Sequence, residues 1–171
     1  VKICGLRTPE HVTAAIDAGA DMLGLIFYEP SHRYIQPQQV TSMLKNTGFV
    51  SAEQSGRAAP ELVGVFVNKE AAFINDIAEQ IGLHIVQLHG DETPEFCQRI
   101  QRPVIKALQL DNSEAKSKVQ AYHESAWRIL LDTPTPTWGG TGVTHDWSLA
   151  QSIAQTMPLI LAGGLNAGNV A

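Results

Sequence analysis

A chain of 171 residues, 44% of them hydrophobic, is long enough for one globular domain that buries about 70% of the surface exposed by its unfolded form. Its formal net charge of -5, with no run of like charges, excludes a basic footprint for nucleic acid and a polybasic face for anionic lipid. We therefore expect one domain over residues 1–171 with a small-molecule partner.

The two cysteines, Cys4 and Cys97, are too few for a disulfide framework or a four-ligand metal site. This cysteine usage fits a reducing cytosol. No apolar run approaches the roughly 20 residues of a membrane span, and no signal peptide is visible. These features predict a cytoplasmic protein that does not bind a membrane.

Short apolar runs alternate along the chain with longer segments of helical periodicity. The expected strands cover 1–4, 22–27, 62–67, 85–88, 103–108, 128–131 and 158–162. The expected helices cover 9–19, 37–45, 69–82, 93–101, 112–124 and 145–155, with the start of a seventh at 165–171. Threonine–proline pairs at positions 8 and 93 are typical helix starts, and Gly19 and Gly82 are typical residues after a helix end.

The expected strands are apolar throughout rather than alternating, which indicates strands covered on both faces. That is the signature of a parallel sheet in an α/β protein. Two architectures fit this pattern: an open doubly wound sheet, and an eight-stranded barrel that here stops one strand short. The segment 48–60, rich in small and polar residues, predicts a surface loop remote from the chemistry.

In both architectures the functional surface lies outside the carboxyl ends of the parallel strands. The residues at or just after those ends are Cys4, Ser31 to Arg33, Asn68, Gln87 with His89, Lys106, Asp132, and Gly163 with Gly164. Most of these side chains are chemically useful, and several are costly to bury without a purpose.

Each candidate has a structural and a chemical interpretation. Cys4 is either a small core residue or a reactive thiol, and Cys97, in the middle of an expected helix, serves as its inert comparison. Asp132 either caps the turn after its strand or acts as a general acid. Arg33 is either a solvated charge or a clamp for a carboxylate or phosphate.

The end of the fourth expected strand carries Gln87 and His89, which either belong to a hydrogen-bonded scaffold or contact substrate. The remaining histidines show no spacing typical of a metal site. Two glycine clusters, 138–143 and 161–169, precede expected helices, where backbone N–H groups can hold an anion. Their position after two consecutive late strands favours a phosphate site.

Taken in this order, the motifs resemble those of the phosphoribosylanthranilate isomerase family of tryptophan biosynthesis. The matching segments are KICG (2–5), DAGAD-x-x-GLIF (17–27), SHRYI (31–35), GVFVN (64–68), VQLHGDE (86–92), LLD (130–132), GGTG (139–142) with DW (146–147), and LAGGLNAGNV (161–170). The resemblance implies a (β/α)8 barrel without cofactor or metal, and so favours the barrel over the open sheet.

The resemblance also implies an aldose–ketose isomerase that performs an Amadori rearrangement of N-(5-phosphoribosyl)anthranilate to carboxyphenylamino-deoxyribulose 5-phosphate. That reaction needs an acid to protonate the furanose oxygen and a base to remove the C2' proton. In the family pattern Cys4 is the thiolate base and Asp132 is the protonated acid. The phosphate would lie on the glycine-rich loops, at Gly140, Thr141, Gly142, Gly163 and Gly164.

Arg33 corresponds to the family arginine that faces the anthranilate carboxylate, while Gln87 and His89 would line the pocket. The arginine loop usually reads SPR and here reads SHR, so we expect Arg33 to be held less rigidly. The family's eighth strand is absent, which would leave two unpaired edges and an open core. The chain is therefore expected to be truncated or to need a partner.

Two other functions remain open at this point. One is a non-catalytic barrel fragment that binds phosphate, and the other is a different phosphosugar isomerase or epimerase on the same barrel. A fusion or association with indole-glycerol-phosphate synthase is a further expectation from the family.

Overall fold

The computed structural model describes residues 1–45, 47, 49, 59–109, 115–132, 147–155, 157–166, 168 and 169. Its strands are β1 (Lys2–Cys4), β2 (Met22–Ile26), β3 (Glu61–Phe66), β4 (Ile85–Leu88), β5 (Val104–Gln109), β6 (Arg128–Asp132) and β7 (Leu159–Leu161). Its helices are α1 (Pro9–Asp17), α2 (Pro37–Lys45), α4 (Ala71–Ile81), α5 (Pro94–Cys97), α6 (Ala115–Ala121) and α7 (Trp147–Ala154).

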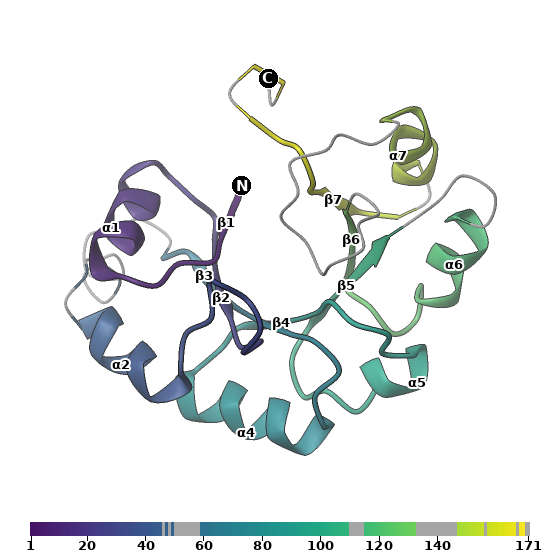
Figure 1. Ribbon diagram of the computed structural model, residues 1–171. Helices are drawn as coiled ribbons and strands as arrows, with labels where there is room; N and C mark the ends of the chain where they lie inside the picture. Colours follow the sequence, from purple (N-terminus) through teal and green to yellow (C-terminus); the bar gives the residue numbers. More distant parts are fainter. Residues whose placement is uncertain are drawn as a thin grey trace.

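Each strand pairs in parallel with the next, so the order in the sheet is the order in the chain, β1 to β7. The register places Cys4 beside Gly24 and Gln109 beside Asp132. Figure 1 shows the strands as an open arc with the helices on its outer side and both chain ends near the opening. A doubly wound sheet would carry helices on both faces, so the expected barrel architecture is confirmed as an open half-barrel.

The core has two layers because side chains point alternately to the two faces of each strand. On β3, Leu62 and Phe66 pack toward the helices, in a cluster that includes Val12 and Ile74. Val63 faces the inside of the arc, in a second cluster with residues of β4, β5 and β6. Burial on both faces is the reason that the strands read as continuous apolar runs.

The predicted helix boundaries of α1, α4 and α5 rest on identifiable capping contacts. The Thr8 side chain accepts a hydrogen bond from the backbone N–H of His11, and Thr93 accepts one from Phe96. Gly82 follows α4 in the left-handed conformation, at φ 76°. No helix among the described residues is long and apolar enough to cross a membrane.

Two predicted helices differ from the structure. The expected helix 93–101 is only Pro94–Cys97, because the N–H groups of Arg99 and Ile100 bond to carbonyls three residues earlier and tighten the last turn. At the expected helix start after β7, the described residues form a turn. There the Asn166 N–H donates to Asn169 Oδ1 at 2.7 Å.

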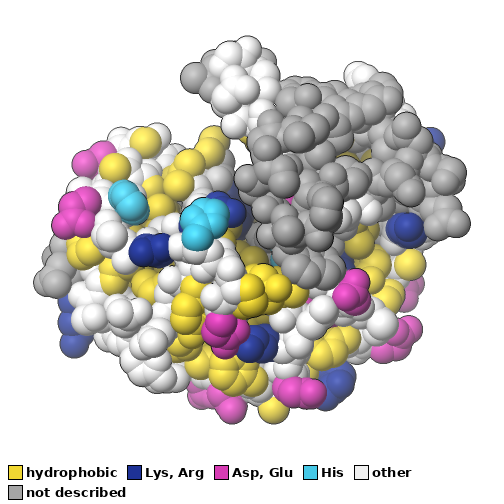
Figure 2. All heavy atoms as spheres, in the orientation of Figure 1, with side chains coloured by type: hydrophobic (Ala, Val, Ile, Leu, Met, Phe, Trp, Pro, Cys, Tyr) yellow, Lys and Arg dark blue, Asp and Glu magenta, His cyan; other side chains and the backbone are white. Residues whose placement is uncertain are grey.

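The expected loop 48–60 lies largely outside the described residues. On the face shown in Figure 2, acidic and basic side chains of the described residues are interspersed along the lower edge, as the absence of like-charge runs in the sequence predicts.

Helix α4 offers a direct test of this core. Ile74 is fully buried, while the neighbouring Phe73 is 41% exposed. We expect Ile74→Ala to lower the free energy of unfolding by about 2–5 kcal/mol, because it leaves a cavity between helix and sheet. Phe73→Ala should cost less than about 1 kcal/mol. Urea denaturation measures both, and equal losses would contradict this packing.

Candidate active site

A cavity of about 560 Å³ lies at the carboxyl ends of the strands, inside the arc. The strand-end candidates that line it are Cys4, Ser31, Arg33, Gln87, His89, Asp132, Gly163 and Gly164, whereas His32, Asn68 and Lys106 do not. These residues come from β1, β4 and β6 and from the segments after β2, β4 and β7. The parallel sheet therefore brings together residues up to 160 positions apart in the chain. Gly140, Thr141 and Gly142 lie outside the described residues.

Cys4 ends β1 and is partly exposed to the cavity. It sits against Gly24 of β2, where an added Cβ would lie 2.7 Å from the Cys4 Sγ. The absence of a side chain at position 24 therefore makes room for the thiol. Cys97 is buried on the helix side of the sheet, and burial raises the pKa of its thiol to about 11. The two cysteines therefore differ in their surroundings: Cys4 is accessible from the cavity, and Cys97 is buried in the core.

Arg33 lies across the backbone of Gly5, in the loop that follows β2. A Cβ at Gly5 would fall 2.6 Å from the Arg33 Cδ, and Gly5 has a φ of 86°, so both space and backbone conformation require glycine there. Among the described residues the buried Arg33 Nε has no hydrogen-bond partner. An unpaired buried guanidinium nitrogen at a cavity is suited to an anionic ligand oxygen.

The arginine loop is held by hydrogen bonds in the absence of the usual proline. The Arg33 N–H donates to Ser31 Oγ at 3.2 Å, and the Tyr34 N–H donates to the Ser31 carbonyl at 3.0 Å. Arg7 Nη1 also donates to the carbonyl of His32. These contacts fix the loop backbone on either side of the arginine.

Gln87, His89 and Asp132 form a chain of polar contacts across β4 and β6. Gln87 Nε2 lies 2.9 Å from His89 Nδ1. His89 Nε2 lies 3.3 Å from Asp132 Oδ2, and the side chains of this second pair are only 13% and 7% exposed. His89 Nε2 has no hydrogen-bond partner among the described residues, so this contact is a close approach of two polar groups.

Lys106, one of the predicted strand-end residues, does not reach the cavity. It lies inside β5 on the same face as Val104, toward the helices, where it is 1% exposed. Its Nζ donates to Glu92 Oε2 at 2.8 Å and to the Gly90 carbonyl at 2.6 Å. Sequence reasoning missed Glu92 as its partner, although a lone lysine in a buried strand calls for a nearby carboxylate.

Glycines 163 and 164 follow β7 with φ values of 79° and 66°. This left-handed backbone at the cavity wall suits close approach of a ligand to successive N–H groups.

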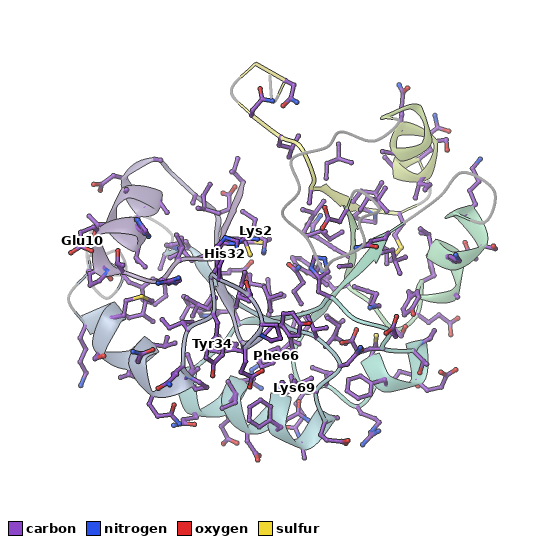
Figure 3. All side chains as sticks on the ribbon, viewed as in Figure 1. Lys2, Glu10, His32, Tyr34, Phe66 and Lys69 are labelled. Atoms are coloured by element: carbon purple, nitrogen blue, oxygen red, sulfur yellow. The ribbon has the colours of Figure 1, made fainter. Side chains whose placement is uncertain are left out.

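Sequence reasoning also missed three polar residues that line the cavity, Lys2, Tyr28 and Asn166. Figure 3 labels Lys2 on β1, the strand that ends at Cys4. The sequence does contain a signal for Lys2. Side chains alternate between the two faces of β1, so Lys2 lies on the same face as Cys4.

A thiol, a carboxyl group and a guanidinium around one cavity can move protons on a small anionic ligand. The described residues contain no group of three or more metal-ligating side chains. Together, the half-barrel and this cavity define a TIM-barrel-type protein with a polar cavity at its strand ends, lined by candidates for acid–base chemistry.

Comparison with known proteins narrows this class to one family. The family model described as N-(5'phosphoribosyl)anthranilate (PRA) isomerase matches residues 1–171. The curated isomerase of Geobacter sulfurreducens is 41% identical over 171 residues, which cover 99% of this chain and 79% of that protein. The chain therefore belongs to the N-(5'-phosphoribosyl)anthranilate isomerase family.

Solved structures agree with this assignment. The crystal structure of phosphoribosyl anthranilate isomerase from Thermotoga maritima superposes with a TM-score of 0.83 at 38% identity, over 99% of this chain and 78% of that one. A second isomerase structure, in complex with reduced 1-(o-carboxyphenylamino)-1-deoxyribulose 5-phosphate, gives a TM-score of 0.79 at 35% identity, over 99% and 77% of the two chains.

The two cysteines should differ in their reaction with iodoacetamide. At pH 8 a thiol with a pKa of about 11 is ionised in only about one molecule in a thousand, and Cys97 is also 2% exposed. We expect peptide mapping by mass spectrometry to show Cys4 alkylated at least about 10-fold faster than Cys97 in the folded protein. In denaturant both should react, and equal labelling of the folded chain would contradict the site.

Proposed function

We propose that this chain isomerises N-(5'-phosphoribosyl)anthranilate in tryptophan biosynthesis, with Cys4 as general base and Asp132 as general acid. The activity follows from the family and from its curated relatives. The observation that supports the two roles is that Cys4 and Asp132, from strands β1 and β6, line one cavity. An acid and a base that act on neighbouring atoms of one sugar must reach it from separate walls.

The proposed reaction has two main proton transfers. Asp132 gives its proton to the furanose ring oxygen, the C1'–O bond breaks, and the anthranilate nitrogen lone pair forms the C1'=N bond of an iminium ion. The Cys4 thiolate then removes the C2' proton, and the electron pair of that C–H bond neutralises the iminium. The resulting enolamine becomes the aminoketose when O2' loses its proton and C1' gains one. In net, one hydrogen moves from C2' to C1' and one from O2' to the former ring oxygen, which leaves Asp132 protonated and Cys4 ionised again.

The substrate's two anionic groups have candidate partners at separate places. Arg33 lines the cavity, its buried Nε has no hydrogen-bond partner among the described residues, and its guanidinium would hold the anthranilate carboxylate. Gly163 and Gly164, with left-handed backbone, would receive the phosphate. We propose that Gly140, Thr141 and Gly142 complete the phosphate site.

Two further proposals concern where the protein resides in the cell and which protein it associates with. Two free cysteines, Cys4 and Cys97, fit a cytoplasmic protein. Association or fusion with indole-glycerol-phosphate synthase remains a prediction from the family resemblance.

The catalytic roles predict the behaviour of two variants. We expect Cys4→Ala and Asp132→Asn each to lower kcat by at least about 100-fold, because each removes a group that transfers a proton. Loss of anthranilate fluorescence with freshly formed substrate measures the rate. Cys97→Ala is the matched control and should keep kcat within about three-fold, since Cys97 is remote from the cavity and only fills the core.

The same assay separates the alternatives. If both variants keep activity within a few-fold of wild type, the assigned roles are wrong. Tight binding of the reduced product analogue by calorimetry with no turnover would favour a non-catalytic phosphate-binding barrel. Turnover of a phosphosugar that lacks the aromatic amine would favour a different isomerase.

Arg33 should act mainly through substrate binding. We expect Arg33→Met to raise KM about 10- to 100-fold, the loss expected for one charged hydrogen bond. Gly5→Ala should raise KM less, because its new Cβ displaces the arginine without removing it. Arg99→Met, an exposed arginine on the helix side, is the control and should leave KM within two-fold. An unchanged KM in Arg33→Met would exclude the carboxylate contact.

A further inference from the structure

The backbone around His89 is fixed from two sides. Its own N–H donates to the Phe66 carbonyl of β3 at 2.9 Å. The carbonyls on either side of it, those of Leu88 and Gly90, both accept from Lys106 Nζ, at 3.4 and 2.6 Å. Glu92 Oε2 also accepts from the Gly90 N–H at 2.9 Å, which ties the buried ion pair to the same turn. The main freedom left to His89 is rotation of its side chain.

Gln87 restrains that side chain. Residues 87 and 89 lie two apart where β4 ends, so both side chains point into the cavity while Leu88 points toward the helices. Gln87 Nε2 lies 2.9 Å from His89 Nδ1. With the Gln87 amide oriented so that Nε2 faces the ring, the amide donates and Nδ1 accepts. A neutral imidazole that accepts at Nδ1 carries its proton on Nε2.

The other ring nitrogen faces the proposed general acid. His89 Nε2 lies 3.3 Å from Asp132 Oδ2, close but without a hydrogen bond to it. A contact that is long in the free protein and tightens when charge forms stabilises the later state more than the ground state. The charge in this case is the carboxylate that Asp132 becomes when it loses its proton.

From this geometry we infer that Gln87 fixes His89 in the Nε2–H tautomer, and that His89 donates this hydrogen to the Asp132 carboxylate formed during ring opening. The inference rests on the proposed role of Asp132. In that step the Asp132 O–H bond breaks, its proton goes to the furanose oxygen, and its electron pair stays on the carboxylate. The His89 proton remains on Nε2 throughout. Gln87 and His89 are thus positioning residues.

The tautomer can be measured without any substrate. We would label the protein with ¹⁵N-histidine and record long-range ¹H–¹⁵N correlation spectra at pH 8.5, above the usual titration range of imidazole. The His89 signals are those missing from the spectrum of His89→Gln. We expect the proton on Nε2. A proton on Nδ1 in the wild-type protein overturns the inference whatever the isomerase assays show.

An isosteric change should reverse the tautomer. The Gln87→Glu carboxylate can only accept, so the His89 proton should move to Nδ1. Gln98→Glu adds the same charge at an exposed position after α5 and should leave the His89 signals unchanged. A proton that stays on Nε2 in Gln87→Glu overturns the inference. If Gln87→Glu does not fold, the wild-type spectrum alone decides.

The kinetic consequence is a loss in kcat with little change in KM. We expect Gln87→Glu and His89→Gln each to lower kcat about 10- to 100-fold, because the Asp132 carboxylate loses a donor that acts only in the transition state. Gln98→Glu should match wild type. An Nε2 proton together with an unchanged kcat in both variants would refute the donation to Asp132, even if the Asp132→Asn assay had confirmed the acid.

Discussion

The two-residue alternation of side chains on strands buried on both faces is the constraint on which the site depends. In β4 it sends Gln87 into the cavity and Leu88 against the helices, and in β6 it does the same for Asp132 and Leu131. A shift of one residue in any strand would exchange the two faces. The parallel register then aligns the strand ends, so that groups far apart in the chain meet at one edge.

The buried pair Lys106–Glu92 shows how the layer outside the cavity supports it. The two side chains are only 1% and 2% exposed, and removing two charges from water costs free energy. The attraction between the charges offsets that cost only when both groups also make further hydrogen bonds. Lys106 finds these at the backbone of the turn after β4, and Glu92 finds them at the N–H groups of Asn68 and Gly90. The polar cluster therefore stabilises the turn that carries His89.

Missing side chains are equally important on the cavity wall. Gly24 leaves room for the Cys4 thiol, and Gly5 lets the Arg33 side chain cross the backbone beside it. Both glycines lie next to β1 or in the strand paired with it. The thiol and the guanidinium can therefore occupy adjacent parts of one small cavity only because these two positions carry no Cβ.

The sequence by itself determined the seven parallel strands and the candidates at their ends, because burial on both faces and helical periodicity leave direct marks on residue order. The family resemblance, again from sequence, favoured the barrel. Only the tertiary structure decided that Lys106 faces the helices, that α5 stops at Cys97, and that Gln87 touches His89. Strand ends, partners of buried charges and hydrogen-bond geometry depend on residues distant in the chain, so local patterns carry no record of them.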